Sequence, residues 1–191
     1  MKRITGALLC LLTAALSGCG ETGAVSSDAG KSGNGYEDVL SAYNEAVDSG
    51  DADDYLSVIY PEKILDEIRS SDRYDELVEL AGDKLGLVRD NLEAGYGENA
   101  VTKFVDISSV KQLDASETAA ALNYFSSLAE EYGVSAENIK IEDGVVFEWT
   151  QLCEGDAGSE EKKRTACAVR VEDDGWKFIS ISADDLKDIY G

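Results

Sequence analysis

The stretch Asp173–Ile181, DDGWKFISI, decides how the last two strands of this chain are expected to pair. An Asp-Gly pair between runs of alternating apolar residues is a strong signal for a β-hairpin with a two-residue turn. We therefore predict a turn at 174–175 that joins strands at 164–172 and 176–182. In that register Val171 faces Phe178.

The preceding strand is expected at 145–153, VVFEWTQLC, after a shorter strand at 139–143. If Cys153 faces Cys167, the predicted pairings place one set of apolar residues on a single side of the sheet: Phe147, Trp149, Val169, Val171, Trp176 and Phe178. This face is expected to be core beneath the helices. The alternative is that its aromatic members, Phe147, Trp149, Trp176 and Phe178, line part of a ligand pocket.

The sequence before the sheet has the apolar period of helices. A first helix is expected from Tyr36 to a stop at Gly50, where a glycine C-cap belongs. A short helix follows near 53–59. Pro61 suits the first position of another short helix.

A longer helix is expected to start at a cap formed by Ser71 or Asp72 and to stop near 95–97. Within it, Gly82 and Gly86 stand four residues apart. Each glycine costs about 1 kcal/mol relative to alanine in a helix interior. The pair therefore predicts close packing against another element or a local kink.

Residues 101–113 have strand character, but the parity of their apolar residues changes, which predicts a bulge near 108–109. Asp114 and Glu117 form a capping-box pattern, so we expect the next helix to begin there. Gly133 is expected to end it.

The amino terminus has the order of a secretory signal peptide, with a positively charged start and an apolar run over 4–16. This run is shorter than the ~20 residues that span a bilayer. Residues 16–19, Leu-Ser-Gly-Cys, resemble the bacterial lipobox. We therefore expect 1–18 to be a lipoprotein signal peptide and Cys19 to carry the lipid; an ordinary cleaved signal with a chance cysteine is the alternative.

Residues 19–35 are then the lipidated cysteine and a flexible Gly/Ser linker, because this stretch cannot bury enough apolar surface to fold. Residues 36–191 are expected to form one α+β domain. The predicted location is the outer face of the bacterial cytoplasmic membrane. Since exported proteins meet oxidising conditions, the facing Cys153 and Cys167 predict a cross-strand disulfide; two free thiols are the alternative.

The chain is strongly acidic, with 17 Lys and Arg against 39 Asp and Glu and a net charge of −22. Removal of 1–18 takes away two basic residues and leaves 15, so the mature chain would carry −24. This charge excludes nucleic acid as a general partner and favours cationic ones.

The sequence contains no histidine, which excludes Ser-His-Asp and Cys-His nucleophile pairs and histidine zinc sites. Carboxylate and tyrosine chemistry remains: Asp106 and Glu148 could point inward, although no acid-base pair can be assigned. The acidic stretch 48–54 lacks the glycine that a calcium-binding EF-hand loop requires. Helix capping by Asp51 or Asp53 explains it instead. No catalytic residue, metal or cofactor is predicted.

With a last short helix at 184–190, the predicted order is helices first, a long bent strand, another helix, and then antiparallel strands. This order, with the Asp-Gly-Trp-Lys hairpin at 174–177, resembles the NTF2-like (cystatin-like α+β cone) superfamily over 36–182, and in particular the small lipoproteins of Gram-positive bacteria that carry such a domain. The resemblance implies N-terminal helices packed on a curved, mainly antiparallel sheet. The conical pocket of that superfamily serves small ligands, partner domains or, in a minority, catalysis.

We therefore expect a membrane-anchored extracytoplasmic lipoprotein that acts as a noncatalytic module. The membrane is contacted through the lipid on Cys19, and the module binds a small ligand or a protein of the cell envelope. One alternative is a cone-fold enzyme that uses Asp, Glu and Tyr in acid-base chemistry. Another is a structural or inhibitory envelope protein that recognises a protein partner through its acidic surface.

Overall fold

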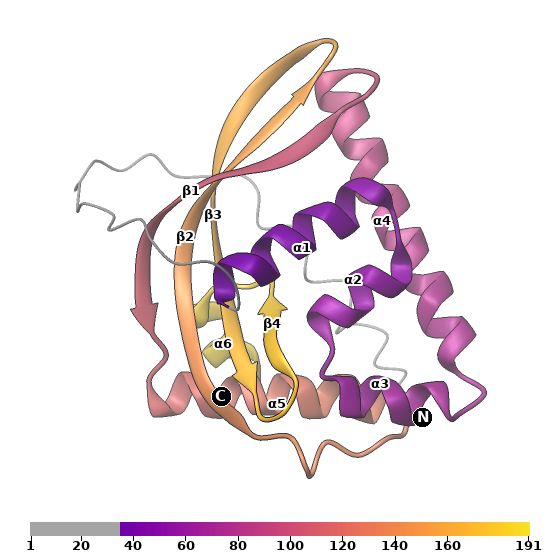
Figure 1. Cartoon of the computed structure of the whole chain (residues 1–191), viewed down its shortest axis with the longest axis vertical. Coiled ribbons are helices and arrows are strands. Elements are labelled where there is room, and N and C mark those ends of the chain that lie inside the picture. Colours follow the sequence, from indigo (N-terminus) through magenta and orange to yellow (C-terminus); the bar gives the residue numbers. More distant parts are fainter. Residues whose placement is uncertain (1–34) are drawn as a thin grey trace.

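The computed structural model describes residues 35–191 and has an α+β fold (Figure 1). These residues form six helices and one four-stranded antiparallel sheet with the strand order β1-β2-β3-β4. The helices are α1 (Tyr36–Ser49), α2 (Ala52–Ile59), α3 (Glu62–Arg69), α4 (Tyr74–Tyr96), α5 (Ala115–Glu131) and α6 (Ala183–Tyr190). The strands are β1 (Val101–Gln112), β2 (Ile141–Gly155), β3 (Gly158–Val171) and β4 (Gly175–Ile179). The expected signal peptide and lipidated cysteine, residues 1–18 and Cys19, lie outside the described residues, as does the linker up to residue 34.

Local signals set most boundaries of the first helices. Gly50 follows α1 in the left-handed conformation, with a φ of 71°. The Asp51 carboxylate caps α2 by accepting a hydrogen bond from the Asp54 N–H at 3.0 Å. Pro61 is the N-cap of α3, whereas it was predicted to be the first residue of that helix; α3 therefore begins one residue later, at Glu62. The predicted serine or aspartate cap of α4 is wrong, because Arg73 holds the N-cap and no side chain caps it.

The middle of the chain agrees with its sequence signals. The pairing of β1 with β2 shifts at 107–109, where the bulge was predicted, and a second shift lies at 104–106. The capping box is confirmed, since the Asp114 N–H donates to the Glu117 carboxylate at 2.7 Å and Asp114 accepts from the Glu117 N–H at 2.8 Å. Gly133 follows α5 with a φ of 71°.

The predicted register between β2 and β3 is wrong. A tight turn at 156–157 joins the two strands, so that Cys153 faces Glu160 and Cys167 faces Val146. The charged residues 160–163 lie between the two predicted strands and were expected to form a loop, but they form part of β3. Their backbone N–H and C=O groups bond to β2, while most of their side chains stay in solvent. Polar residues can therefore form a strand, although their composition favours a loop.

The predicted disulfide is therefore absent, and Cys153 and Cys167 are free, buried thiols. Cys167 lies seven residues beyond the partner of Cys153 on β3, which at ~3.3 Å per residue is roughly 23 Å along the strand. Burial raises the pKa of both thiols, that of Cys167 to about 12. Thiols of this kind are unreactive at neutral pH.

The register between β3 and β4 also differs from the prediction. Val171 faces Gly175 instead of Phe178, and the turn occupies 172–174. Asp173 adopts the left-handed conformation there, with a φ of 63°, which aspartate tolerates better than most residues. A three-residue turn with one left-handed position is the next most common hairpin connection after the predicted two-residue turn.

The two register errors cancel for the aromatic residues. Phe147 faces Ala166, and Phe178 faces Ala168, so all four predicted aromatic residues still share one side of the sheet. Val169 was predicted on the same side and lies on the opposite one, together with Val171. On the aromatic side of the sheet, β3 contributes Ala166 and Ala168 in place of these two valines.

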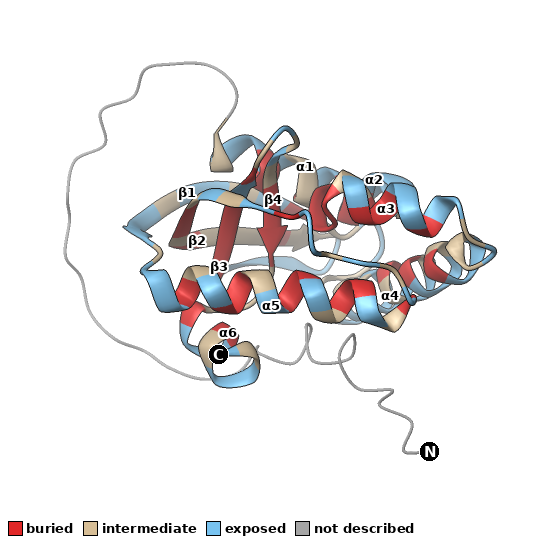
Figure 2. Cartoon of the chain, turned by 90° about the horizontal axis from the view of Figure 1, so that it is seen from below, coloured by how far each residue is buried: buried red, intermediate tan, exposed pale blue. Residues whose placement is uncertain are grey.

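Helices lie on both sides of the sheet. Figure 2 shows α1, α2 and α3 on one side and α5 and α6 on the other, with the buried residues facing inward. Tyr43 of α1 packs on Phe178 with 4.2 Å between ring centroids. The main core thus lies between α1 and the aromatic side of the sheet, and a second apolar layer lies between the sheet and α5.

The predicted close packing at Gly82 and Gly86 is wrong. A methyl group added to either glycine would meet no other group within 4 Å. Only three residues of the 23-residue helix α4 are buried, namely Leu77, Ala81 and Leu85. Both glycines lie on the sides of the helix that this narrow stripe leaves uncovered.

A buried ion pair ties the β3–β4 turn to the helices. Lys177 Nζ lies 2.9 Å from Asp174 Oδ1, and the two side chains are 7% and 10% exposed. The second oxygen of Asp174 accepts the N–H of Glu62, at the start of α3, at 2.6 Å. Lys177 also donates to the carbonyl of Ser57 in α2 at 2.9 Å. The turn is therefore fixed against both helices.

Candidate functional site

The predicted aromatic face is packed core. Phe147, Trp149 and Phe178 are 1–3% exposed, and Trp176 is half-buried. Tyr36 of α1 contacts both Phe147 and Trp176, with ring centroids 5.7 and 5.8 Å apart. Neither of the two hollows described below is lined by any of the four, so α1 covers the surface that a ligand in this place would need.

The two carboxylates considered for acid-base chemistry point outward. Asp106 on β1 and Glu148 on β2 are both exposed. A general acid or base at neutral pH requires burial or a close charge to move its pKa. These two positions have neither the enclosure nor a shared cleft.

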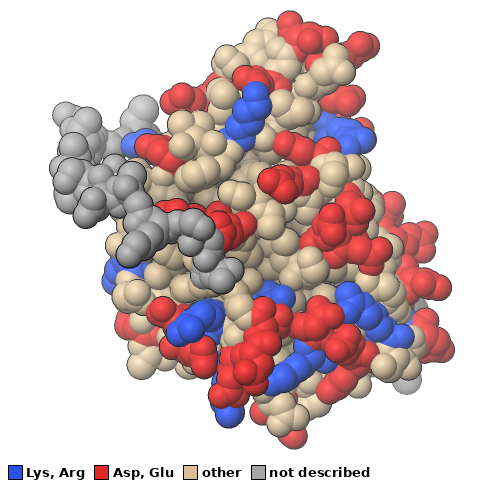
Figure 3. All heavy atoms as spheres, viewed as in Figure 1, with Lys and Arg blue, Asp and Glu red and all other residues tan. Residues whose placement is uncertain are grey.

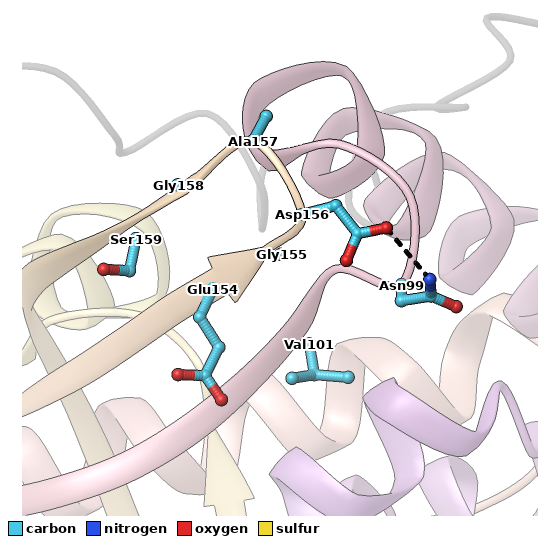
Figure 4. A pocket seen from close by; sticks show the side chains of 8 residues that line it. All are labelled: Asn99, Val101, Glu154, Gly155, Asp156, Ala157, Gly158 and Ser159. Atoms are coloured by element: carbon cyan, nitrogen blue, oxygen red, sulfur yellow. Dashed lines mark hydrogen bonds between the residues drawn. The ribbon is translucent and has the colours of Figure 1, made fainter.

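The larger hollow lies open to solvent at the tip of the β2–β3 hairpin (Figure 4). Its volume is ≈ 550 Å³, and it is lined by Asn99, Val101 and residues 154–159. Both of its carboxylates are engaged: Glu154 pairs with Lys103, and Asp156 accepts from Asn99 at 3.2 Å. An open polar surface of this kind does not exclude water.

The second hollow is a small cavity between α2 and α4. Its apolar lining comes from Leu56, Ile59, Leu77 and Ala81, and its polar lining from Tyr55, Tyr60 and Lys84. The volume is ≈ 10 Å³, about the space of one water-sized sphere. Apart from Lys84, which is partly buried, every residue that lines it is at most 4% exposed.

Two polar groups in this cavity have no hydrogen-bond partner. Among the described residues, four buried side-chain atoms lack one: Tyr60 Oη, Lys84 Nζ, Glu131 Oε2 and Trp149 Nε1. Buried polar atoms are satisfied in the large majority of cases. It is therefore notable that the Tyr60 hydroxyl and the Lys84 amine border the same cavity.

Burial sets the protonation of this site. Lys84 Nζ lies 5.4 Å from the centre of the Tyr55 ring, and desolvation lowers the pKa of Lys84 to about 8. Desolvation also raises the pKa of Tyr55 and Tyr60 well above the ordinary value of 10. The site therefore combines an amine that loses its proton near neutral pH with hydroxyls that keep theirs. Such a combination can form or stabilise an adduct on nitrogen.

Lys84 was not among the sequence-predicted site residues, although a signal for it existed. It lies seven residues after Leu77 and three after Ala81, so it falls on the buried side of α4. A lysine at such a position usually extends its stem to carry the charge to water. The structure shows that α2 closes over the amine instead.

The outer side of α4 is acidic and carries two exposed leucines. Leu80 and Leu87 are 38% and 60% exposed and lie two helical turns apart, on the same side of the helix. The exposed acidic residues of α4 are Asp75, Glu76, Glu79, Asp83, Asp90 and Glu93. In Figure 3 red spheres predominate along the right-hand side, where α4 lies.

Other kinds of site find no support among the residues that the structure describes. No group of three or more Asp, Glu or Cys side chains within 35–191 is arranged to hold a metal ion. No helix in that range is long and apolar enough to cross a membrane.

Comparison of this chain with protein-family models, with curated proteins and with solved structures found no match in any of the three.

Proposed function

We propose that this protein is a lipid-anchored extracytoplasmic lipoprotein that acts as a noncatalytic protein-interaction module, with α4 as its contact surface. The observation that carries the proposal is the pair of exposed leucines, Leu80 and Leu87, on an otherwise acidic helix. An amphipathic helix that lays apolar anchors into a groove is a recurring mode of recognition. The partner would offer an apolar groove with a basic rim.

A protein partner is favoured over a small ligand because the aromatic face, once a candidate pocket, lies under α1 with Phe147 and Phe178 each 1% exposed. The acidic surface would also speed association with a basic partner. Anchoring is proposed from the lipobox resemblance at Cys19. Bacterial lipidation supplies more than one acyl chain, as stable anchoring requires.

The NTF2-like cone is likewise a proposal. The bent strands β1 and β2 and the helices that precede them support it (Figure 1). The sheet of the described residues is open and has helices on both sides, so a conical ligand pocket is not part of the proposed function.

The anchor is tested by feeding producing cells a labelled fatty acid. Label on the wild-type chain that Cys19→Ala abolishes, and that Cys10→Ala leaves in place, would support lipidation. Equal labelling of the Cys19→Ala variant would contradict lipidation of Cys19. Cys10 serves as the control because it lies within the predicted signal peptide and has no role in the mature protein.

The contact surface is tested by cross-linking the full chain in intact native cells and identifying the linked proteins by mass spectrometry. The variant Leu80→Asn/Leu87→Asn should lose a specific cross-linked partner. The matched control is Val105→Asn/Val110→Asn on β1, since both valines are 46% exposed. A partner that the α4 variant keeps, or that both variants lose alike, would contradict a specific role for α4.

A further inference from the structure

The hairpin of β2 and β3 extends beyond β4 and leaves one edge of β3 unpaired. β4 pairs only with 167–171, so the outer edge of 158–166 meets no strand of the described residues. Figure 1 shows this hairpin extending well above β4. In an antiparallel ladder, every second residue directs its backbone N–H and C=O groups to the outer edge. Such an edge is a ready template for another strand.

The side chains along this open edge are charged. Residues 160–164 read Glu-Glu-Lys-Lys-Arg, so two negative and three positive charges leave a net charge of +1 in a chain of −22. The contact of Lys162 with Glu160, at 3.4 Å, is the only ion pair that these five residues make within 35–191. Two copies of this acidic chain therefore repel each other less here than at the acidic side of α4.

The length of the open edge sets a register for pairing with a second copy. The stretch 158–166 lies between the turn at 156–157 and the end of β4, and its middle residue is Lys162. A second copy that fills this stretch with its own 158–166, running antiparallel, must therefore be centred on Lys162. A pairing of a surface with itself in this way has two-fold symmetry.

The charges independently favour the same register. In a pairing centred on Lys162, Glu160 faces Arg164 of the second copy and Glu161 faces its Lys163, and the two-fold axis repeats both pairs. Opposite charges that face each other across two strands stabilise a sheet. Only Lys162 faces a like charge, that of its own copy. The Glu160 carboxylate, 3.4 Å from Lys162 in the same chain, reduces this repulsion.

We propose that this protein forms a two-fold symmetric dimer through the outer edge of β3, in which 158–166 of two copies pair antiparallel around Lys162. The two four-stranded sheets then join into one continuous sheet. This dimer accounts for a charged segment that forms a strand beyond the end of β4. It depends neither on the lipid anchor nor on the α4 surface proposed above.

The register is tested with a cysteine at the two-fold axis. In Lys162→Cys, the two new side chains face each other with Cα atoms about 4.5–5.5 Å apart, a distance that a disulfide spans. The full chain is produced in native cells, the membranes are treated with a mild oxidant, and dimers are separated on a non-reducing gel.

Two controls accompany this variant. Lys163→Cys places the two cysteines about 8 Å apart, which is too far for a disulfide, and should give at least tenfold less dimer. The wild-type chain, whose Cys153 and Cys167 are buried, shows the background.

The ion pairs are tested by exchanging charges in the Lys162→Cys chain. Glu161→Lys or Lys163→Glu alone sets like charges opposite each other at two places and should lower the yield of dimer about tenfold. The double exchange Glu161→Lys/Lys163→Glu restores both pairs and should restore the yield.

Three results would overturn the proposal: no dimer from Lys162→Cys, equal amounts from Lys162→Cys and Lys163→Cys, or no recovery in the double exchange. Adding Leu80→Asn/Leu87→Asn to the Lys162→Cys chain should leave the dimer in place. The outcome is therefore separate from that of the α4 surface.

Discussion

Replacing Lys84 with methionine should increase the stability of this protein at pH 7, because the substitution removes a desolvated charge while filling the same space. Methionine is unbranched and adapts to the path that the lysine stem follows. Lys84 Nζ has no hydrogen-bond partner that would be lost. Most substitutions of buried residues lower the stability of a protein. An increase for Lys84→Met is therefore a stringent test of the buried charge.

The magnitude follows from the pKa. A folded-state value of about 8, against 10.5 for an ordinary lysine, corresponds to roughly 3 kcal/mol of unfavourable free energy in the protonated form. Solvent still reaches part of the Lys84 side chain, and its screening offsets about 1 kcal/mol of this. We therefore expect Lys84→Met to raise the free energy of unfolding by about 2 kcal/mol at pH 7.

The pH dependence identifies the cause. Because the unfolded chain binds the proton up to about pH 10.5 and the folded chain releases it near pH 8, wild-type stability should rise between these values relative to the variant. The advantage of Lys84→Met is therefore full below pH 8 and shrinks as the pH approaches 10.5. Comparing the two proteins cancels the tyrosines, whose raised pKa values affect both alike.

The assay is urea unfolding at pH 7, 8, 9 and 10. With a slope of about 2 kcal/mol per molar urea, the midpoint should rise by about 1 M at pH 7. Lys63→Met, at an exposed position, should change it little. A lower midpoint for Lys84→Met at pH 7, or a difference that is the same at pH 7 and pH 10, would refute the burial of an unpaired charge.

Three further outcomes are expected. Both buried cysteines should resist a thiol reagent in the folded protein and react after unfolding, and reduction should leave the mass unchanged; a gain of two hydrogens would show a disulfide. Asp174→Ala should lower the free energy of unfolding by about 3 kcal/mol, because it leaves Lys177 buried without its partner. In the same urea titration, Asp173→Asn at the exposed neighbouring position should change this free energy by less than about 0.5 kcal/mol. Gly82→Ala and Gly86→Ala should each raise the free energy of unfolding by about 1 kcal/mol in the urea titration, since nothing lies within 4 Å of the added methyl group. A loss of stability would mean that the helix needs these glycines.

The features that were predicted correctly are mostly local ones. The stop of α1 at Gly50, the capping box of Asp114 and Glu117 and the bulge at 107–109 were all predicted, because each depends on residues within a few positions of one another. The cap of α4 was the exception, since two plausible capping residues stood next to the one that is used.

The candidate site shows the limit of sequence reasoning more sharply. The four aromatic residues were placed correctly on one side of the sheet, but only because two register errors cancelled. Lys84 was recognisable as a lysine on an apolar stripe. What could not be read was that the Tyr60 hydroxyl, 24 positions away, would border the same cavity.

The sequence by itself determined the α+β class, most of the helix boundaries and the strongly negative charge of this protein. These properties come from composition and from interactions between near neighbours in the chain. The tertiary structure alone decided the strand registers, the separation of Cys153 from Cys167 and the burial of Lys84. A register depends on the hydrogen-bonded ladder of two distant segments as a whole, and a lysine becomes buried only when another helix packs over it.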